Sequence, residues 1–170
     1  LALLFATSAS TVQPRLATEP VSKDPDDPAI WVHPSDPSRS LILGTNKTPA
    51  PTGALVVFGL DGKIRQTIDG IDRPNNVDVE YGLKLSGKPA DIAVLTERLQ
   101  KRLRVFAIAP DGSGLKDLGA QGLPVFADQS GEKAAPMGIA LYRRTKDGAI
   151  FAIVGRKEGP PNGYLWQYRL

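Results

Sequence analysis

The chain has 170 residues, of which 41% are hydrophobic and 23% are charged, so its composition is that of a globular protein and excludes wholesale disorder. It contains no cysteine and one histidine, His33, which excludes disulfides, thiolate zinc sites, cysteine nucleophiles and histidine-rich metal sites. The net charge of +3 favours anionic partners only weakly. Because no block of Lys and Arg accompanies it, nucleic acid is not an expected partner.

The N-terminal segment is apolar and then rich in small residues. Residues 1–10, LALLFATSAS, are typical of the end of a secretory signal peptide, with an ordinary N-terminal strand as the alternative. Since the chain does not begin with Met, we expect this signal peptide to be truncated. Ten residues are too few for a membrane span, which needs about 20. The segment predicts a secreted or periplasmic protein without a membrane span. Residues 11–25 are polar and aperiodic, as expected of a linker or an outer strand.

The remaining sequence consists of short apolar runs separated by turn signals. Asp-Gly pairs at 61–62, 111–112 and 147–148 predict tight turns. No window shows a sustained apolar period of 3.6 residues, so we expect little or no helix and an all-β fold. The predicted strands are 29–33, 41–45, 54–60, 63–68, 77–81, 91–96, 102–109, 138–143, 150–154 and 164–170.

Three of these runs have the same form and indicate a repeat. They read LILGTNK (41–47), IAVLTER (92–98) and FAIVGRK (151–157), and each ends in a cation. Twenty residues before these cations stand Asp27, Asp78 and Met137, an equal spacing that predicts equivalent positions. A unit of about 50–60 residues suits a four-stranded propeller blade. Three blades cannot close a ring, so we expect about half of a larger β-propeller in residues 26–170.

The cations at the ends of these runs suggest a binding site. If the runs are equivalent strands, Lys47, Arg98 and Lys157 emerge on one face, where a ring of cations favours an anion such as phosphate. The alternative is that each is a basic residue ending a strand in solvent. Asp26-Asp27-Pro28 and Asn75-Asn76 also allow plain turn chemistry, and Glu158 beside Lys157 allows a rim ion pair.

The assembled segments resemble the β-propeller phytases, the calcium-dependent 3-phytase family. The resemblance covers residues 22–170, which correspond to the first half of a six-bladed family member. The segments that carry it are DPDDPAIWVHP (24–34), GTNK (44–47), NNVDVEYG (75–82), DIAVLTER (91–98), MGIALYRR (137–144) and GRKEG (155–159).

This resemblance implies a hydrolase that releases phosphate from phytate (inositol hexakisphosphate). It implies phosphate contacts and catalytic roles for Lys47, Arg98, Lys157 and Glu158, and a substrate contact for Asn76. It also implies that Asp26, Asp27 and Asp78 lie at a calcium cluster that activates the attacking water. Two positions depart from the family pattern: Met137 replaces a tyrosine, and Thr48 replaces a lysine that some members carry.

We therefore expect a 3-phytase-type phosphatase that is a monomer at full length. Because its open blades expose unpaired strand edges, we expect the 170-residue chain alone to be inactive and poorly folded. Two alternatives stay open: a propeller that binds anionic ligands without turning them over, and a propeller hydrolase of another substrate.

Overall fold

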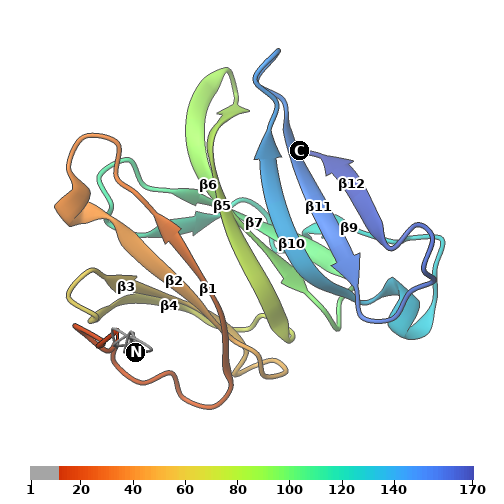
Figure 1. Cartoon of the computed structure of the whole chain (residues 1–170), viewed down its shortest axis with the longest axis horizontal. Helices are drawn as coiled ribbons and strands as arrows, with labels where there is room; N and C mark the ends of the chain where they lie inside the picture. Colours follow the sequence, from red (N-terminus) through yellow and green to blue (C-terminus); the bar gives the residue numbers. More distant parts are fainter. Residues whose placement is uncertain (1–11) are drawn as a thin grey trace, which may run out of the picture.

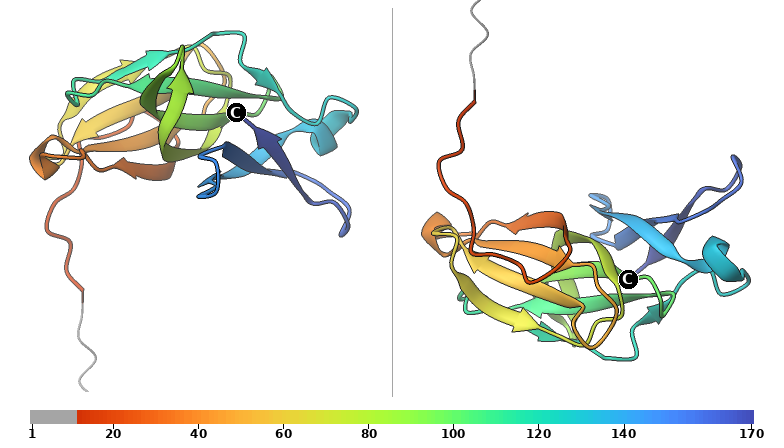
Figure 2. Two further views of the ribbon diagram at one scale, coloured as in Figure 1. Left: turned by 90° about the horizontal axis from the view of Figure 1, so that it is seen from above. Right: turned by 90° about the horizontal axis from the view of Figure 1, so that it is seen from below.

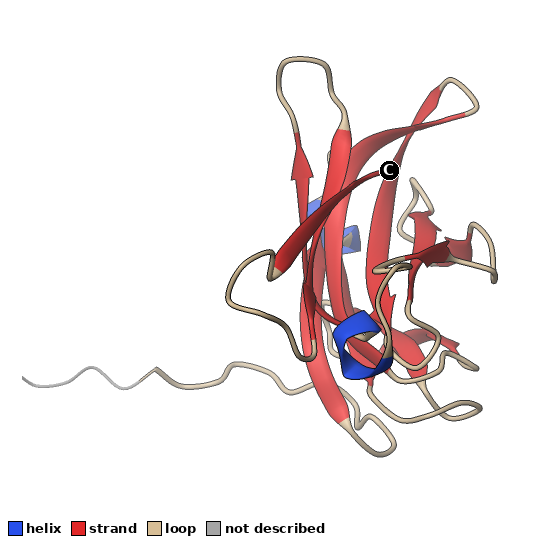
Figure 3. Cartoon of the chain, turned by 90° about the vertical axis from the view of Figure 1, so that its right-hand side faces the viewer, coloured by secondary structure: helices blue, strands red, loops and turns tan. Residues whose placement is uncertain are grey.

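The computed structural model of the protein describes residues 12–170, so the signal-like segment predicted at 1–10 lies outside the described residues. Within residues 12–170 the helical elements are two short 3₁₀ helices, η1 (Pro37–Arg39) and η2 (Gly131–Ala134), and the rest is strand and loop (Figures 1 and 3). The strands are β1 (Pro25–Trp31), β2 (Leu41–Asn46), β3 (Ala54–Gly59), β4 (Ile64–Ile68), β5 (Pro74–Leu85), β6 (Lys88–Glu97), β7 (Arg102–Ile108), β8 (Leu115–Asp117), β9 (Leu123–Pro124), β10 (Pro136–Arg143), β11 (Ile150–Arg156) and β12 (Leu165–Arg169).

The strands form three antiparallel sheets that follow one another along the chain. Their orders are β1-β2-β3-β4, β5-β6-β7-β8 with β9 also paired to β7, and β10-β11-β12. The first strand of the second sheet, β5, contacts the first strands of the other two sheets, β1 and β10, and the later strands fan outward (Figure 1). This is the arrangement of successive propeller blades, and we refer to the sheets as blades 1, 2 and 3.

All ten predicted strands are present, but several bounds were wrong. β1 begins at Pro25 rather than at residue 29, because prolines are tolerated at the first residue of a strand and at a bulge. β5 and β6 extend well beyond the predicted runs and meet at Ser86 and Gly87, both of which have positive φ. The short strands β8 and β9 were missed because two or three residues give no period.

The pairing registers show that the repeat is real but that its predicted alignment was wrong. Pro25, Pro74 and Pro136 begin the inner strands and pair with Asn46, Glu97 and Arg156, the residues directly before the three cations. Each proline is followed by a β-bulge, which contains Asp26-Asp27, Asn75-Asn76 or Met137-Gly138.

Asp78 therefore does not correspond to Asp27. Asp78 pairs with Val94 four positions before Arg98, and its counterparts in the other blades are Ala29 and Ala140. The equal spacing of twenty residues gave an incorrect alignment because the three inner hairpins differ in length.

Two hydrophobic cores lie between the blades. The core between blades 1 and 2 contains Trp31, Leu55 and Phe106, and the core between blades 2 and 3 contains Leu103, Phe126 and Val154. Along β6, Ile92 and Val94 face the second core while Ala93 and Leu95 face the first. Burial on both faces explains the continuous apolar run that predicted this strand.

Four aromatic side chains pack against the blades. Trp31 is fully buried in the first core, Phe58 packs on the other face of blade 1, and Trp166 and Tyr168 pack against the second core. The single histidine, His33, lies just after β1 and accepts backbone N–H bonds from Ser35 and Asp36 at Nδ1. These bonds give it a structural role in the turn.

The segment before β1 is not a strand: its first described residues project away from the sheets (Figure 2), and its later residues contact the outside of blade 1. Glu19 N donates to Gly62 O, and the Glu19 carboxylate accepts from Ile64 N at 2.7 Å. Val21 packs against Val56 and Phe58. Among the described residues, no helix is long and apolar enough to cross a membrane.

Candidate anion-binding site

The three predicted cations lie at equivalent points of the three blades. We call this end of the fan the mouth: β1, β5 and β10 begin there, and β2, β6 and β11 end there. The backbone N–H of each cation donates to the carbonyl just before the inner strand of its own blade. These bonds are Lys47 N to Asp24 O (2.8 Å), Arg98 N to Arg73 O (3.1 Å) and Lys157 N to Ala135 O (2.8 Å). The same backbone bond thus fixes all three strand ends.

Threonine hydroxyls join the bulge of one blade to the bulge of the next. Thr45 Oγ1 accepts from Asp27 N and donates to Asn75 O at 2.7 Å. Thr96 Oγ1, one blade further on, accepts from Asn76 N and donates to Met137 O, also at 2.7 Å. Because both threonines are buried, these bonds hold successive mouth segments at a fixed separation.

Two of the mouth cations already contact a carboxylate. Lys47 Nζ lies 2.6 Å from Asp26 Oδ1, and both side chains are about a quarter exposed. Arg98 Nη2 lies 2.8 Å from Oε2 of Glu132, which belongs to η2. Lys157 and Glu158 are exposed beside η2, where Glu158 N donates to Glu132 O at 3.4 Å. The mouth is therefore a mixture of cations and carboxylates.

Glu132 lies in a strongly cationic environment. Its pKa is lowered from the ordinary value because Arg98 donates a hydrogen bond to the carboxylate. The positive charges of Arg98, Lys157 and Arg73 stabilise the same anion. Cations from three separate segments therefore act on one carboxylate position.

The residue before each cation is polar and buried, and it orders the loops around the mouth. Asn46 donates to Thr52 O and accepts from Asp24 N. Glu97, fully buried, accepts from Asp72 N and pairs with Arg102. Arg156 lies over the rings of Phe126 and Trp166 and donates to Gly163 O. None of the three was predicted from the sequence, because each resembles an ordinary polar strand end.

The carboxylates predicted to bind metal are not gathered at one point. Asp26 is paired with Lys47, and Asp27 Oδ2 accepts from Val77 N of blade 2 at 3.0 Å. Asp78 lies further along β5, where its two oxygens accept from Val79 N and from Leu141 N of blade 3. Within residues 12–170 no three His, Cys, Asp or Glu side chains form a group that could hold a metal ion. The metal role of these residues stays a prediction.

The remaining predicted residues lie at the bulges. Asn76 is half-buried, and its backbone N–H binds Thr96. Its neighbour Asn75 is 1% exposed, and neither polar atom of its side chain has a partner in the described structure. Met137 occupies the corresponding bulge of blade 3 and brings no polar atom in its side chain. Thr48 is bound within its loop through Thr52 and through Arg73 N.

Arg73 is a further cation near the mouth, and it was not predicted from the sequence. It stands outside the seven-residue runs, directly before β5, and has a positive φ of 61°. Its backbone N–H donates to Thr48 O, while its carbonyl accepts from Arg98 N. The sequence feature that could have predicted Arg73 is a basic residue directly before a proline and an Asn-Asn pair.

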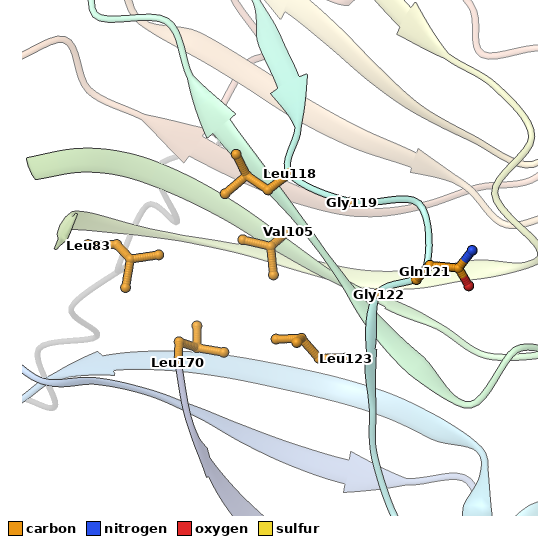
Figure 4. Close-up of a pocket in the computed structure, with 8 residues that line it drawn as sticks. All are labelled: Leu83, Val105, Leu118, Gly119, Gln121, Gly122, Leu123 and Leu170. Atoms are coloured by element: carbon orange, nitrogen blue, oxygen red, sulfur yellow. The ribbon is translucent and has the colours of Figure 1, made fainter. Parts of the chain in front are cut away.

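A separate pocket of about 270 Å³ lies between blades 2 and 3 (Figure 4). It is lined by Leu83, Val105, Leu118, Gly119, Gln121, Gly122, Leu123 and Leu170. The lining contains no charged side chain and none of the mouth cations, so this pocket does not suit an anion.

Cations at equivalent strand ends of successive propeller blades make this mouth a candidate anion-binding site of a β-propeller. The chain belongs to the phytase family: the family model described as "Phytase" matches residues 4–169. A curated relative, the 3-phytase of Bacillus subtilis (strain 168), is 35% identical over 147 residues. The match covers 84% of this chain and 36% of that protein, so the chain spans about a third of the length of this relative.

Proposed function

We propose that this chain forms part of the active site of a 3-phytase-type phosphatase that removes phosphate from phytate. The observation that carries the proposal is the placement of Lys47, Arg98 and Lys157 at equivalent strand ends of one mouth. Membership of the phytase family and the similarity to a protein named 3-phytase support the choice of reaction and substrate.

The mouth residues suit the binding of a phosphate ester. Hydrolysis of such an ester depends mainly on positioning and on neutralising charge. Arg98 offers a planar fork of donors to phosphate oxygens, while Lys47 and Lys157 act as point charges. In the proposed site these three residues hold substrate phosphates, Asn76 contacts the substrate from its bulge, and Glu158 lies beside the reacting group.

Membership of the phytase family also supports a metal-dependent enzyme, and we propose that the metal is calcium. Calcium prefers oxygen ligands, and the bulges offer oxygen donors from Asp26, Asp27 and the unpartnered side chain of Asn75. Asp78 contributes only if it gives up a backbone bond. When bound, calcium would supply a water of lowered pKa and offset phosphate charge. The cations of the chain then orient the ester toward that water.

The experiment compares the 170-residue chain with a chimera in which the chain replaces the 147 aligned residues of the Bacillus subtilis enzyme. We expect the folded chimera to release phosphate from phytate when calcium is present. The release should stop when calcium is chelated. Lys47→Met in the chimera should reduce the rate at least about tenfold, since a charged hydrogen bond contributes about 1.5–3 kcal/mol. Lys63→Met, on the exposed β3–β4 turn, is the matched control. A folded chimera that releases no phosphate with calcium would overturn the proposal.

A second candidate is a propeller that binds phosphorylated ligands without hydrolysing them. Met137 favours it, because this mouth position lacks a group that could donate to phosphate. Calcium-dependent binding of phytate by the folded chimera, with no phosphate released, would establish this candidate instead.

A panel of other phosphoesters and lactones at fixed calcium concentration tests the third candidate, a hydrolase of another substrate.

We also propose that the protein is secreted or periplasmic, because residues 1–10 are apolar and then small. Fusion of the natural N-terminal region to a reporter that is active only after export tests this proposal. A reporter that stays inactive in cells would count against it.

A further inference from the structure

Glu132 is an anion of the chain itself placed among the mouth cations. It belongs to η2, which precedes blade 3, and its carboxylate lies 2.8 Å from Arg98 Nη2. The Arg98 side chain is 13% exposed, whereas that of Glu132 is 50% exposed. Because Glu132 lies at the solvent side of a largely covered arginine, it can leave without unpacking a core.

Backbone bonds tie the segments that carry the cations to this carboxylate. Arg98 N donates to Arg73 O, and Lys157 N donates to Ala135 O at the end of η2. The charges of Arg98, Lys157 and Arg73 all lower the pKa of Glu132. The position of the Glu132 carboxylate is therefore one at which an anion is stabilised from blade 2, from blade 3 and from the loop before β5.

Arg73, whose charge acts on the Glu132 carboxylate, has an uncommon backbone conformation. A positive φ is disfavoured for residues with a side chain, and such strain is often found at functional sites. Two bonds enforce it, from Arg73 N to Thr48 O and from Arg98 N to Arg73 O. Its guanidinium Nε is buried and has no partner in the described structure. The chain thus fixes a cation between the mouth segments of blades 1 and 2 and leaves one of its donors unused.

We propose that Arg73 completes a phosphate subsite with Arg98 and Lys157, and that Glu132 occupies this subsite until a phosphate group displaces it. The inference rests on the proposed function for the identity of the ligand. Carboxylate and phosphate both present oxygen pairs that match a guanidinium fork. Phosphate carries more charge and more acceptor oxygens, so it takes the same position in preference to Glu132. Glu132 lowers the apparent affinity for phosphate, because it reduces the vacant fraction of the subsite.

The experiment titrates inorganic phosphate into the full 170-residue chain and, as a second measurement, into the chimera, at constant ionic strength. Glu132→Gln keeps the shape of the side chain and removes its charge, so we expect phosphate to bind about fivefold more tightly. Arg73→Gln should weaken binding about tenfold, and Arg73→Lys, which keeps the charge but not the fork, should fall between. The matched controls are Arg144→Gln and Asp147→Asn, an ion pair on the β10–β11 hairpin at the other end of blade 3.

Circular dichroism verifies that each variant is folded before its affinity is compared. If Arg73→Gln binds phosphate as tightly as the control Arg144→Gln does, Arg73 is not part of the subsite. Glu132→Gln with unchanged or weaker binding would show that Glu132 does not compete with phosphate. Absence of phosphate binding by both the parent and Glu132→Gln would overturn the subsite altogether. These readouts do not depend on hydrolysis, so they are separate from a failure of the chimera to cleave phytate.

Discussion

Single hydroxyl and carboxylate groups set the spacing of the blades at the mouth. Thr45 and Thr96 each bind two backbone groups, one from their own blade and one from the next. Asp27 and Asp78 each accept a backbone N–H from the following blade, at two different heights along the inner strands. In blade 3 the position equivalent to Thr45 and Thr96 is occupied by Gly155. The hydroxyl link between blades therefore occurs twice in residues 12–170.

Thr96→Val should destabilise the protein by about 2 kcal/mol. The hydroxyl is fully buried, and its loss leaves Asn76 N and Met137 O without their partner. An unsatisfied buried polar group costs about 1–3 kcal/mol. The free energy of unfolding from denaturant titration measures the change.

Thr67→Val, on an exposed position of β4, is the matched control for this substitution. It should be close to neutral because valine suits a strand at least as well as threonine. Equal stability of the two variants would contradict the role assigned to the Thr96 hydroxyl.

At the scale of elements, a buried ionic network holds the end of β6 to its neighbours. Glu97 Oε2 lies 2.5 Å from Arg102 Nε and 3.5 Å from Arg104 Nη1. Arg104 also pairs with Asp117 of β8. The other oxygen of Glu97 accepts from Asp72 N, next to Arg73. The network thus connects the outer strands of blade 2 to the loop that carries a mouth cation.

Glu97→Gln should lower the free energy of unfolding by about 3 kcal/mol. The substitution leaves two arginines facing a neutral amide in a buried position, and removal of one partner of a buried pair costs about 3–5 kcal/mol. Thermal and denaturant unfolding measure the loss. Glu158→Gln, exposed and one residue after a mouth cation, should change stability by less than about 0.5 kcal/mol. A stable Glu97→Gln protein would show that the network is dispensable.

The β10–β11 hairpin gives a pH-dependent prediction. Arg144 donates to both oxygens of Asp147, and Ala149 N donates to Oδ1. These bonds lower the pKa of Asp147 from an ordinary value of 3.8 to about 2. Since the folded pKa lies below the unfolded one, the contribution to stability is complete above pH 4 and is lost as the pH falls through about 2.

The titration of the Asp147 carboxyl carbon by NMR should show a midpoint near 2 in the parent chain. Arg144→Gln removes the main cause of the shift and should move the midpoint back toward 3.8. Arg65→Gln alters the similar Arg65–Asp61 pair on the β3–β4 turn and should leave Asp147 unchanged. A midpoint near 3.8 in the parent would contradict the bonds to Arg144.

The elements show how far the sequence alone could predict this structure. Strands such as β6, buried on both faces, were evident as apolar runs, and the three cations at their ends were found at the same time. The register was not evident, because hairpin length depends on bulges and turns far from the cations. Asp78 was therefore aligned with Asp27 incorrectly. Arg73 and Glu132 lie in loops without a period, so only the fold brings them near Arg98.

At the scale of the whole molecule, each inter-blade core joins two neighbouring blades. Blade 2 is covered on both faces, whereas blades 1 and 3 each have a face that no other blade covers in residues 12–170 (Figure 1). On blade 1 that face is partly covered by Val21, which packs against Ala54, Val56 and Phe58. On blade 3, β12 pairs only with β11 in the described chain, and Leu165 is 55% exposed.

An unpaired strand edge with exposed apolar side chains is a template for pairing with another chain. The isolated 170-residue chain should therefore associate through β12, and the associated fraction should grow with concentration in size-exclusion chromatography with light scattering. Leu165→Lys places a charge on this edge and should shift the population toward monomer, because charged residues on an edge strand oppose pairing. Leu60→Lys, at an exposed apolar position of the β3–β4 turn, adds the same charge away from the edge and should leave association unchanged. If both substitutions dissociate the chain equally, the effect is one of net charge, and the edge of β12 is not the contact.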